Sequence, residues 1–444
     1  MQLPEAFISR TKALLGKEWE AFYKALNSES PLSIRMNPCK SLPEDYPEIK
    51  KDSPVSWANN AYYLKERPSF TFDPLFHTGC YYVQEASSMY LEQMIKKYVS
   101  EPAKALDLCA APGGKSTLLS SVLPKDSLLV ANEVIRPRAN ILAENLIKWG
   151  NPDAIVTNND PAVIGKLSHF FDVVVADVPC SGEGMFRKDP SAICEWSVNN
   201  VQLCAERQRR IIADIWQALK PGGVLIYSTC TYNREENEDN IDWICQELGA
   251  EQLEEPHRFL PHKTRGEGFF IAALRKTEAD ERDYSQTQRK PKTTRKEIQQ
   301  KIPQELFQWI ENPEDFTIVA EDNTYRAIPQ KHISDYKYLK DSLKVVSAGI
   351  TLAEAKGKDL IPDHSLAMSV SLSQNAFPVW ELDKESSLKY LHKEAILNIP
   401  DNLPKGFVLV SYLGYPLGFV KNIGNRANNL YPQEWRIRMN IPKL

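Results

Sequence analysis

The stretch KALDLCAAPGGKSTLLSSVLPKDSLLVANE (residues 104–133) decides the fold. Its first six residues predict a short buried strand, residues 110–115 a loop with two adjacent glycines, and residues 116–123 a helix. Residues 127–133 predict a second strand, and the helical pattern of 136–149 ends at Gly150. A strand, a glycine-rich turn, a helix and another strand are the repeating parts of a parallel sheet.

Further apolar runs extend this pattern to residue 276. The runs AIVTNND (154–160), DVVVADVP (172–179) and GGVLIYSTC (222–230) are rich in Val and Ile, as is typical of strands buried on both faces. A long helix is predicted over 205–220, ended by Pro221, and FFIAALRK (269–276) closes the unit. Strands that alternate with helices predict an α/β fold with a doubly wound sheet.

Composition excludes several other classes of protein. The length of 444 residues predicts about three globular domains. The hydrophobic fraction of 42% excludes a disordered or collagen-like chain. The start resembles no signal peptide and no run is long enough to cross a membrane, so we expect a cytoplasmic protein. None of the eight cysteines forms a C-x2-C pair, so we expect no metal, and because the sequence shows no secretion signal we expect reduced thiols. The net charge of −4 restricts nucleic-acid binding to local patches.

In an open parallel sheet, ligands bind beyond the carboxyl ends of the strands, so strand-end residues are the candidates for a site. Glu133 follows the second strand, where a carboxylate typically accepts hydrogen bonds from ribose hydroxyls, and Asp160 follows the third, placed to receive a purine amino group. With the glycine loop, these acids fit an adenosyl ligand. The motifs of ATP and NAD sites are absent from the sequence.

Two cysteines also follow strands, Cys180 after the fourth and Cys230 after the fifth. A thiol there can lose its proton and attack an electrophilic carbon. The common alternative is a small buried packing residue, which we predict for Cys39, Cys80, Cys194, Cys204 and Cys245. Spacing does not decide which of the two strand-end thiols attacks.

Three blocks resemble the signatures of a known family. DLCAAPGGK (107–115), DVPCSGEGMFRKDP (177–190) and STCTYNREENE (228–238) resemble those of the RNA (cytosine-5)-methyltransferases of the Nol/Nop/Sun type. The blocks SAGITL (347–352), PDHSLAM (362–368) and GYPLGFVKNIGNRANNLYP (414–432) are similar to the bacterial small-subunit methyltransferase F type, which ends in a PUA-like domain.

This resemblance implies a class I methyltransferase (Rossmann-like) core with an N-terminal α/β extension and a C-terminal PUA-like RNA-binding domain. It also implies S-adenosyl-L-methionine as the cofactor. The expected division of the chain is an N-terminal RNA-binding extension (1–90), the methyltransferase core (91–276), a polar linker (277–303), an intermediate domain (304–380) and the PUA-like domain (381–444).

The resemblance also assigns roles to the strand-end residues. Glu133 would hold the ribose, Asp160 the adenine, Arg138 would face the cofactor, and Asp177 would lie between the cofactor and the target base. The remaining cofactor-binding residues implied are Cys109, Ala110, Ala111, Pro112, Gly113, Gly114 and Lys115. Cys230 matches the family nucleophile and Cys180 the second cysteine that assists product release, whereas the Pro-Cys of DNA cytosine methyltransferases would favour Cys180.

The chemistry needs such a nucleophile, because the 5-position of cytosine is too weakly nucleophilic to take a methyl group unaided. A thiolate that adds to the 6-position makes the 5-position enamine-like, and Asp177 could support the charge on the ring. The target base must leave its stack. Basic residues considered for RNA contacts are Arg187, Lys188, Arg289, Lys290, Lys292, Lys421, Arg426, Arg436 and Arg438.

We therefore predict methylation of the 5-position of cytosine in 16S ribosomal RNA, through a covalent adduct between cysteine and cytosine. The expected partner is ribosomal RNA or the small ribosomal subunit, with no membrane and no metal, and the expected state is a monomer. Two alternatives stay open: a tRNA methyltransferase with the same chemistry, and a non-catalytic ribosome-assembly factor. The second is weakened because both thiols, the three acids and the glycine loop are all present.

Overall fold

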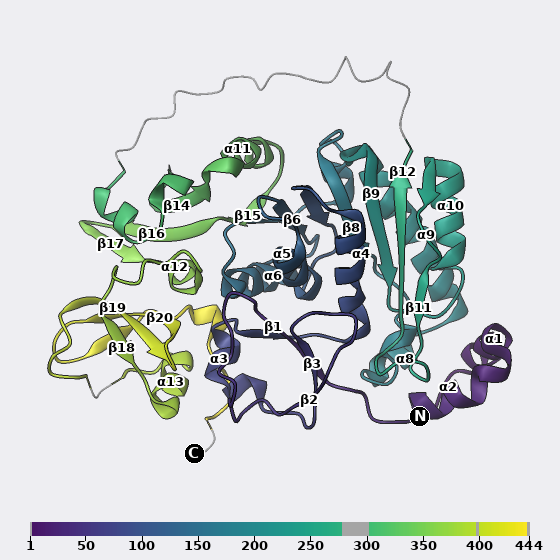
Figure 1. Cartoon of the computed structure of the whole chain (residues 1–444), viewed down its shortest axis with the longest axis horizontal. Helices are drawn as coiled ribbons and strands as arrows, with labels where there is room; N and C mark the ends of the chain where they lie inside the picture. Colours follow the sequence, from purple (N-terminus) through teal and green to yellow (C-terminus); the bar gives the residue numbers. More distant parts are fainter. Residues whose placement is uncertain (1, 278–301, 397–398, 442–444) are drawn as a thin grey trace.

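The computed structural model describes residues 2–277, 302–396 and 399–441 (Figure 1). The predicted polar linker, with Arg289, Lys290 and Lys292, therefore lies almost entirely outside the described residues. No helix in the described ranges is long and apolar enough to cross a membrane.

A nine-stranded sheet forms the centre of the molecule, in the order β10-β12-β9-β8-β5-β6-β7-β15 with β11 paired to β12. Its strands are β5 (Lys104–Asp107), β6 (Leu128–Asn132), β7 (Ala154–Thr157), β8 (Phe171–Asp177), β9 (Leu219–Thr229), β10 (Ala250–Gln252), β11 (His257–Phe259), β12 (Phe269–Lys276) and β15 (Val345–Ala348). Strands β5 to β9 run parallel and β12 runs antiparallel to β9. The predicted doubly wound α/β fold is confirmed.

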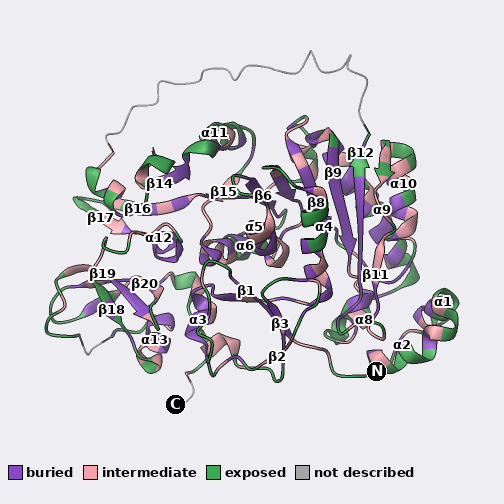
Figure 2. Cartoon of the chain, in the orientation of Figure 1, coloured by how far each residue is buried: buried purple, intermediate pink, exposed green. Residues whose placement is uncertain are grey.

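Helices cover both faces of this sheet. One face carries α4 (Leu91–Tyr98), α5 (Gly114–Val122) and α6 (Arg136–Trp149), and the other carries α7 (Pro161–Ile164), α9 (Val198–Ile215) and α10 (Glu238–Leu248). Alternate residues of one strand enter different cores, because successive strand side chains point to opposite faces. Ala105 packs on the first face and Leu106 on the second. Figure 2 shows β8, β9 and β12 mostly buried, whereas exposed residues lie on the outer sides of α1 and α10.

The helix predicted over 205–220 differs at both ends. α9 begins earlier, at Val198, where the Ser197 side chain accepts a hydrogen bond from the backbone N–H of Asn200, and it ends at Ile215, followed by a short 3-10 turn, Trp216–Ala218. The early end has a physical reason: Leu219 pairs with Phe171 of β8, so the chain has to enter the sheet before Pro221. The predicted end of α6 is confirmed, since Gly150 has the left-handed backbone (φ 89°) that glycine adopts at helix ends.

The N-terminal region combines helices with a small antiparallel sheet of order β2-β3-β1-β4. Its elements are α1 (Glu5–Leu15), α2 (Trp19–Leu26), β1 (Ser33–Met36), β2 (Lys51–Pro54), β3 (Ala61–Leu64), α3 (Pro74–His77) and β4 (Tyr81–Val83). Phe7 and Phe22 pack edge-to-face on Phe186 and Tyr232, which fastens the first helices to the loops beyond β8 and β9.

The C-terminal part contains two four-stranded sheets. The first holds β13 (Phe316–Glu321), β14 (Thr324–Pro329), β16 (Ile350–Lys356) and β17 (Asp359–Pro362), and the second holds β18 (Val379–Glu381), β19 (Gly406–Tyr412), β20 (Tyr415–Asn422) and β21 (Ala427–Asn429). The helices of this part are α11 (Ile333–Ser342), α12 (His364–Met368) and α13 (Lys384–Leu391), whereas α8 (Pro190–Glu195) lies in the core between β8 and α9.

Two connections stand out in this part. β19 and β20 form a hairpin that turns at Leu413-Gly414, and Tyr415 and Pro416 belong to β20. β15, which lies within the expected intermediate domain, pairs antiparallel with β7 and so extends the central sheet.

Candidate active site

The predicted site residues gather at the carboxyl edge of the central sheet. The order of strands reverses at β5, which lies between β6 and β8, and ligands of such sheets bind at this switch point. The positions at this edge are Cys109 after β5, Glu133 after β6, Asp160 after β7, Asp177 at the end of β8, Cys180 just beyond it and Cys230 after β9.

The glycine-rich loop 109–115 is fixed from outside by α6. Arg138 donates a hydrogen bond from Nη2 to the carbonyl oxygen of Ala111 at 2.9 Å, and Asn145 donates from Nδ2 to that of Pro112 at 2.8 Å. Gly113, the residue before α5, has φ 118°, a conformation that side-chain-bearing residues rarely adopt. The sequence therefore needs a glycine at this turn.

The two acids beyond β6 and β7 differ in their surroundings. Glu133 is buried, accepts a hydrogen bond from the backbone N–H of Ile135 at 2.9 Å, and lies 3.4 Å from Arg138 Nη1. Arg138 thus joins Glu133 to the glycine-rich loop. Asp160 is exposed and accepts from the backbone N–H of Ala162 at 3.0 Å, at the start of α7.

Asp107, the last residue of β5, is fully buried below the loop. One carboxylate oxygen accepts a hydrogen bond from Ser116 Oγ at 2.6 Å, while Oδ1 has no partner among the described residues. Burial raises the pKa of Asp107 to about 7. An unpartnered buried oxygen is unfavourable on its own, so this atom suits a ligand that donates a hydrogen bond.

Asp177 is held by two donors. Lys115 Nζ lies 2.8 Å from its Oδ2, and Ser228 Oγ donates to its Oδ1 at 2.8 Å. Burial lowers the pKa of Lys115, but the attraction of Asp177 and the hydrogen bond to it outweigh burial, so the pKa is raised overall. Lys115 is therefore charged at neutral pH, and its side chain reaches from the glycine-rich loop to the end of β8.

The two strand-end thiols face each other. Cys180 Sγ and Cys230 Sγ are 2.9 Å apart, and the backbone N–H of Cys230 points to Cys180 Sγ at 3.4 Å. The hydrogen bond to Cys230 and then burial raise the pKa of Cys180 well above its ordinary value. Cys180 is therefore protonated at neutral pH, and either sulfur can be the donor in the contact between the two thiols.

Two buried carboxylates that the sequence prediction missed, Glu183 and Glu236, tie the two thiol-bearing loops together. Glu183 accepts hydrogen bonds from Thr231 Oγ1 and from the backbone N–H groups of Tyr232 and Asn233, and Glu236 accepts from the backbone N–H of Ser181 and the side chains of Gln208 and Asn233. Both acids lie inside the signature blocks, and this position is the sequence feature that could have indicated a role in the site. Acids in loops are usually solvated, so their residue type alone does not predict burial.

The structure corrects one expected RNA contact. Arg187 is not free for RNA, because its side chain is only 5% exposed and its Nε lies 2.9 Å from Glu267 Oε2. Its other nitrogens donate to the carbonyl oxygens of Ala25 and Gly266. Removing one partner of a buried ion pair costs about 3–5 kcal/mol, so Arg187 is a structural residue.

The other expected contacts have different surroundings. Lys188 is 30% exposed and lies 3.8 Å from Glu267, and Lys421 pairs with Asp359 at 2.6 Å. Arg426, Arg436 and Arg438 are exposed. Two packing predictions for cysteines are wrong, since Cys39 and Cys194 are exposed, whereas Cys80 and Cys204 are buried as expected and Cys245 is partly buried. Cys39 lies in a turn after β1, and Cys194 lies on the short helix α8, so neither faces a core.

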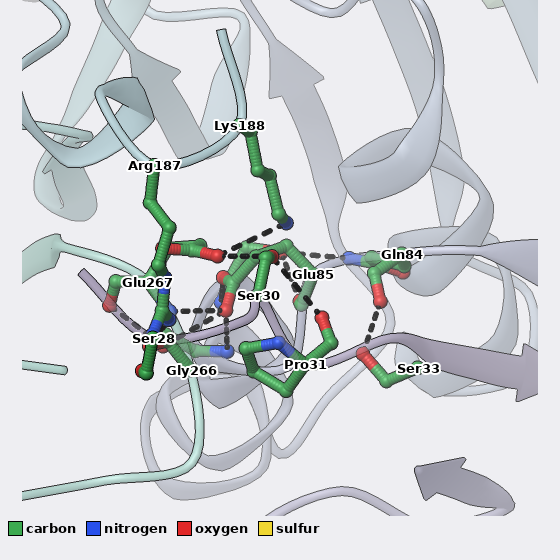
Figure 3. A network of polar contacts seen from close by, with 12 residues as sticks. Ser28, Ser30, Pro31, Ser33, Gln84, Glu85, Arg187, Lys188, Gly266 and Glu267 are labelled. Carbon is green, nitrogen blue, oxygen red and sulfur yellow. Dashed lines mark hydrogen bonds and ion pairs between the residues drawn. The ribbon is translucent and has the colours of Figure 1, made fainter. Parts of the chain in front are cut away.

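A cleft of about 870 Å³ lies between the N-terminal region and the core. Its walls come from residues 28–33 and 64–67 of the N-terminal region, from the end of β4, from Arg187 and Lys188, and from residues 261–266. Figure 3 shows how the walls are joined: Ser30 and Arg187 both bind Glu267, while Ser33 binds the backbone at Gln84. The segment 180–188 connects this cleft with the thiols.

Comparison with known proteins covers most of the chain. Family models match residues 97–275 (16S rRNA methyltransferase RsmB/F), 3–86 (N-terminal domain of 16S rRNA methyltransferase RsmF) and 377–437 (methyltransferase RsmF PUA domain). A protein of Shewanella loihica named ribosomal RNA small subunit methyltransferase F is 31% identical over 90% of this chain and 88% of its own length. The chain belongs to the 16S rRNA methyltransferase RsmB/F family.

Other relatives agree with this membership. The ribosomal RNA small subunit methyltransferase F of Cronobacter sakazakii is 30% identical over 97% of this chain and 96% of its own length. A solved methyltransferase homologue from Pyrococcus horikoshii is 28% identical with a TM-score of 0.54, and the match covers 62% of this chain and 95% of that one. The predicted family, fold class and S-adenosyl-L-methionine as methyl donor are confirmed.

The carboxyl edge fits this cofactor. The glycine-rich turn offers a close backbone approach to a ligand, and the buried carboxylate of Glu133 and the unpartnered oxygen of Asp107 offer acceptors for its donating groups. In the ranges 2–277, 302–396 and 399–441, no cluster of His, Cys, Asp and Glu could hold a metal ion.

Proposed function

We propose that this enzyme methylates the 5-position of cytosine in 16S ribosomal RNA through a covalent cysteine–cytosine adduct. The observation that supports the proposal most strongly is the pair of thiols 2.9 Å apart, one of them protonated, beside Asp177. A single nucleophile would need only one thiol. A second, protonated thiol suits a reaction in which the bond between the first thiol and the cytosine ring must break in the last step.

In the proposed mechanism, the Cys230 thiolate forms a bond to the 6-position of cytosine, and the ring electrons move toward the 5-position. S-adenosyl-L-methionine supplies the methyl group that the 5-position takes up. Asp177 binds the cytosine edge and supports charge at the ring nitrogen, in an orientation kept by Lys115 and Ser228. A base then removes the proton at the 5-position, and the bond to Cys230 breaks to restore the aromatic ring. Cys180 assists this elimination, directly or through a water.

We also propose the cofactor contacts by residue. The loop 109–115 approaches the cofactor through its backbone, Glu133 accepts from the ribose hydroxyls, and Asp160 accepts from the adenine amino group. Arg138 faces the same side and holds both Glu133 and the loop. The exposure of Asp160 supports this role, since its carboxylate keeps acceptor capacity beyond its one bond to α7.

The cleft between the N-terminal region and the core gives the RNA strand next to the target base a path to the thiols. Lys65 and Arg67 are exposed on its N-terminal wall. The other charged groups are already paired: Arg187 binds the carboxylate of Glu267, and Glu85 accepts a hydrogen bond from the backbone N–H of Glu267. Exposed cations on a polar wall suit backbone phosphates more than bases. The proposal therefore assigns sequence-independent contacts to this cleft.

The double variant Lys65→Gln, Arg67→Gln should weaken binding to 16S rRNA and lower its salt dependence. Each lost phosphate contact reduces the slope of log K against log salt by about 0.7, so two contacts reduce it by roughly 1.4. Binding of S-adenosyl-L-methionine should not change. The matched control is Lys125→Gln, Lys166→Gln, two exposed lysines at the opposite, amino edge of the sheet. An unchanged slope in the first variant would remove the cleft from the RNA path.

The choice of RNA is tested by supplying labelled S-adenosyl-L-methionine with small ribosomal subunits, naked 16S rRNA or total tRNA from a strain that lacks the gene. Incorporation into the ribosomal substrates alone supports the proposal. Incorporation into tRNA alone would leave the proposed chemistry unchanged but contradict 16S rRNA as the substrate. Cofactor binding without transfer to any of the three would instead indicate an assembly factor.

A further inference from the structure

Arg35, on β1 of the N-terminal region, reaches into the methyltransferase core directly beneath the glycine-rich loop. Its Nη2 lies 2.6 Å from Thr117 Oγ1 and 3.2 Å from the carbonyl oxygen of Gly114, and its Nη1 lies 3.4 Å from the carbonyl oxygen of Thr117. Gly114 is the first residue of α5. The guanidinium therefore binds the first turn of the helix that follows the loop.

The rest of the Arg35 side chain is fixed as well. Its Nε donates to Gln84 Oε1 at 2.9 Å, and the guanidinium lies over the ring of Trp149 at 4.6 Å. The side chain is buried, with a residue exposure of 2%. Within the described ranges, no carboxylate forms an ion pair with it. Burial lowers the pKa of Arg35 to about 9, so the group is still charged at neutral pH.

A buried cation without a direct ion pair is costly, and here it lies at the positive end of a helix dipole, which adds to the cost. If this position contributed only packing, an apolar side chain of similar volume would stabilise the fold more than Arg35 does. The bonds that offset this cost go to Gly114 and Thr117, which lie directly behind the loop expected to bind the cofactor. The N-terminal sheet also touches that turn, since a Cβ on Gly114 would lie 3.4 Å from the Tyr82 ring.

We propose that Arg35 is a positioning residue for the cofactor site, which holds the first turn of α5, and with it residues 113–115, in the shape that binds S-adenosyl-L-methionine. The N-terminal region then belongs to the cofactor site as well as to the surface that meets RNA. This inference concerns cofactor binding, so it stands whether or not the methylated atom is the 5-position of cytosine.

Asn37, the residue just after β1, offers a matched control. It is as deeply buried as Arg35, and its Nδ2 donates to the carbonyl oxygen of Gly79 in the N-terminal region and to that of Trp149 in the core, both at 2.9 Å. Trp149 is the last residue of α6, at the helix end remote from the loop. Asn37→Ala therefore loosens the attachment of β1 without touching α5.

The test measures the Kd of the full-length protein for S-adenosyl-L-methionine by calorimetry without RNA. Arg35→Met should raise Kd about tenfold, and Arg35→Lys should recover part of that loss. Asn37→Ala should stay within about twofold of the wild type, although Arg35→Met and Asn37→Ala both lower Tm. In the absence of cofactor, amide hydrogen exchange over residues 115–118 should be faster in Arg35→Met and unchanged in Asn37→Ala.

Two results would overturn the proposal. One is an unchanged Kd in a folded Arg35→Met protein, and the other is an equal rise of Kd in Asn37→Ala, which would indicate a general loss of stability. If Arg35→Met does not fold, Thr117→Val decides, because it removes the acceptor at 2.6 Å with little change of shape. It should raise Kd about threefold, and an unchanged Kd there would equally contradict the role of Arg35.

Discussion

Cys180→Ala is expected to leave the protein covalently attached to its RNA substrate, whereas Cys230→Ala should form no adduct and lose methyl transfer by about a thousandfold or more. The reason is the geometry of the pair: the sulfurs are 2.9 Å apart, and the raised pKa of Cys180 keeps that thiol protonated. Without Cys180, the bond to Cys230 can form but its elimination is slow. The adduct would appear as a shifted band in a denaturing gel that disappears after ribonuclease treatment.

Cys245→Ala provides the control for this pair, because Cys245 lies on α10, is partly buried and takes no part in the site. It should form no stable adduct and keep wild-type turnover. A stable adduct with Cys230→Ala and none with Cys180→Ala would contradict the assignment and reverse the two roles. Absence of any adduct in all three variants would contradict covalent catalysis itself.

Asp177→Asn is expected to lower kcat by about 100- to 1000-fold, the loss typical of removing a preorganised group that stabilises developing charge. The substitution keeps the shape of the side chain but removes its charge, which also breaks the ion pair with Lys115. The single-turnover rate, with cofactor and RNA both saturating, separates this loss from weaker binding.

Ser228→Ala is the matched variant for Asp177, because it deletes only the hydroxyl that donates to Asp177 Oδ1 at 2.8 Å. It should lower the same rate by no more than about tenfold. If saturating cofactor restored the wild-type rate in Asp177→Asn, the carboxylate would serve cofactor binding and would have no role at the cytosine.

The parts of the fold that local sequence determines were predicted well. The apolar runs that form β5 to β9 are short, rich in branched residues and separated by helical patterns, so few alternatives compete with a parallel sheet. The strand-end rule then placed Glu133, Asp160, Asp177, Cys180 and Cys230 on one edge, where the structure has them.

What the sequence could not show depends on contacts between distant segments. Arg187 and Glu267 are 80 positions apart, and neither can be identified as one half of a buried ion pair from its own neighbourhood. The same holds for Arg35 beneath α5 and for β15, whose partner β7 lies far upstream. The end of α9 was missed for a related reason, since pairing with β8 overrides the local signal of Pro221.

The most direct test of the proposed chemistry is the identity of the methylated nucleoside. Small ribosomal subunits from a strain that lacks the gene would be incubated with the protein and methyl-labelled S-adenosyl-L-methionine, and the 16S rRNA digested and separated by chromatography with mass detection. The account predicts label in 5-methylcytidine. Label in a ribose-methylated nucleoside, or on the exocyclic nitrogen of cytidine, would contradict it, because neither product requires Cys230 to attack the ring.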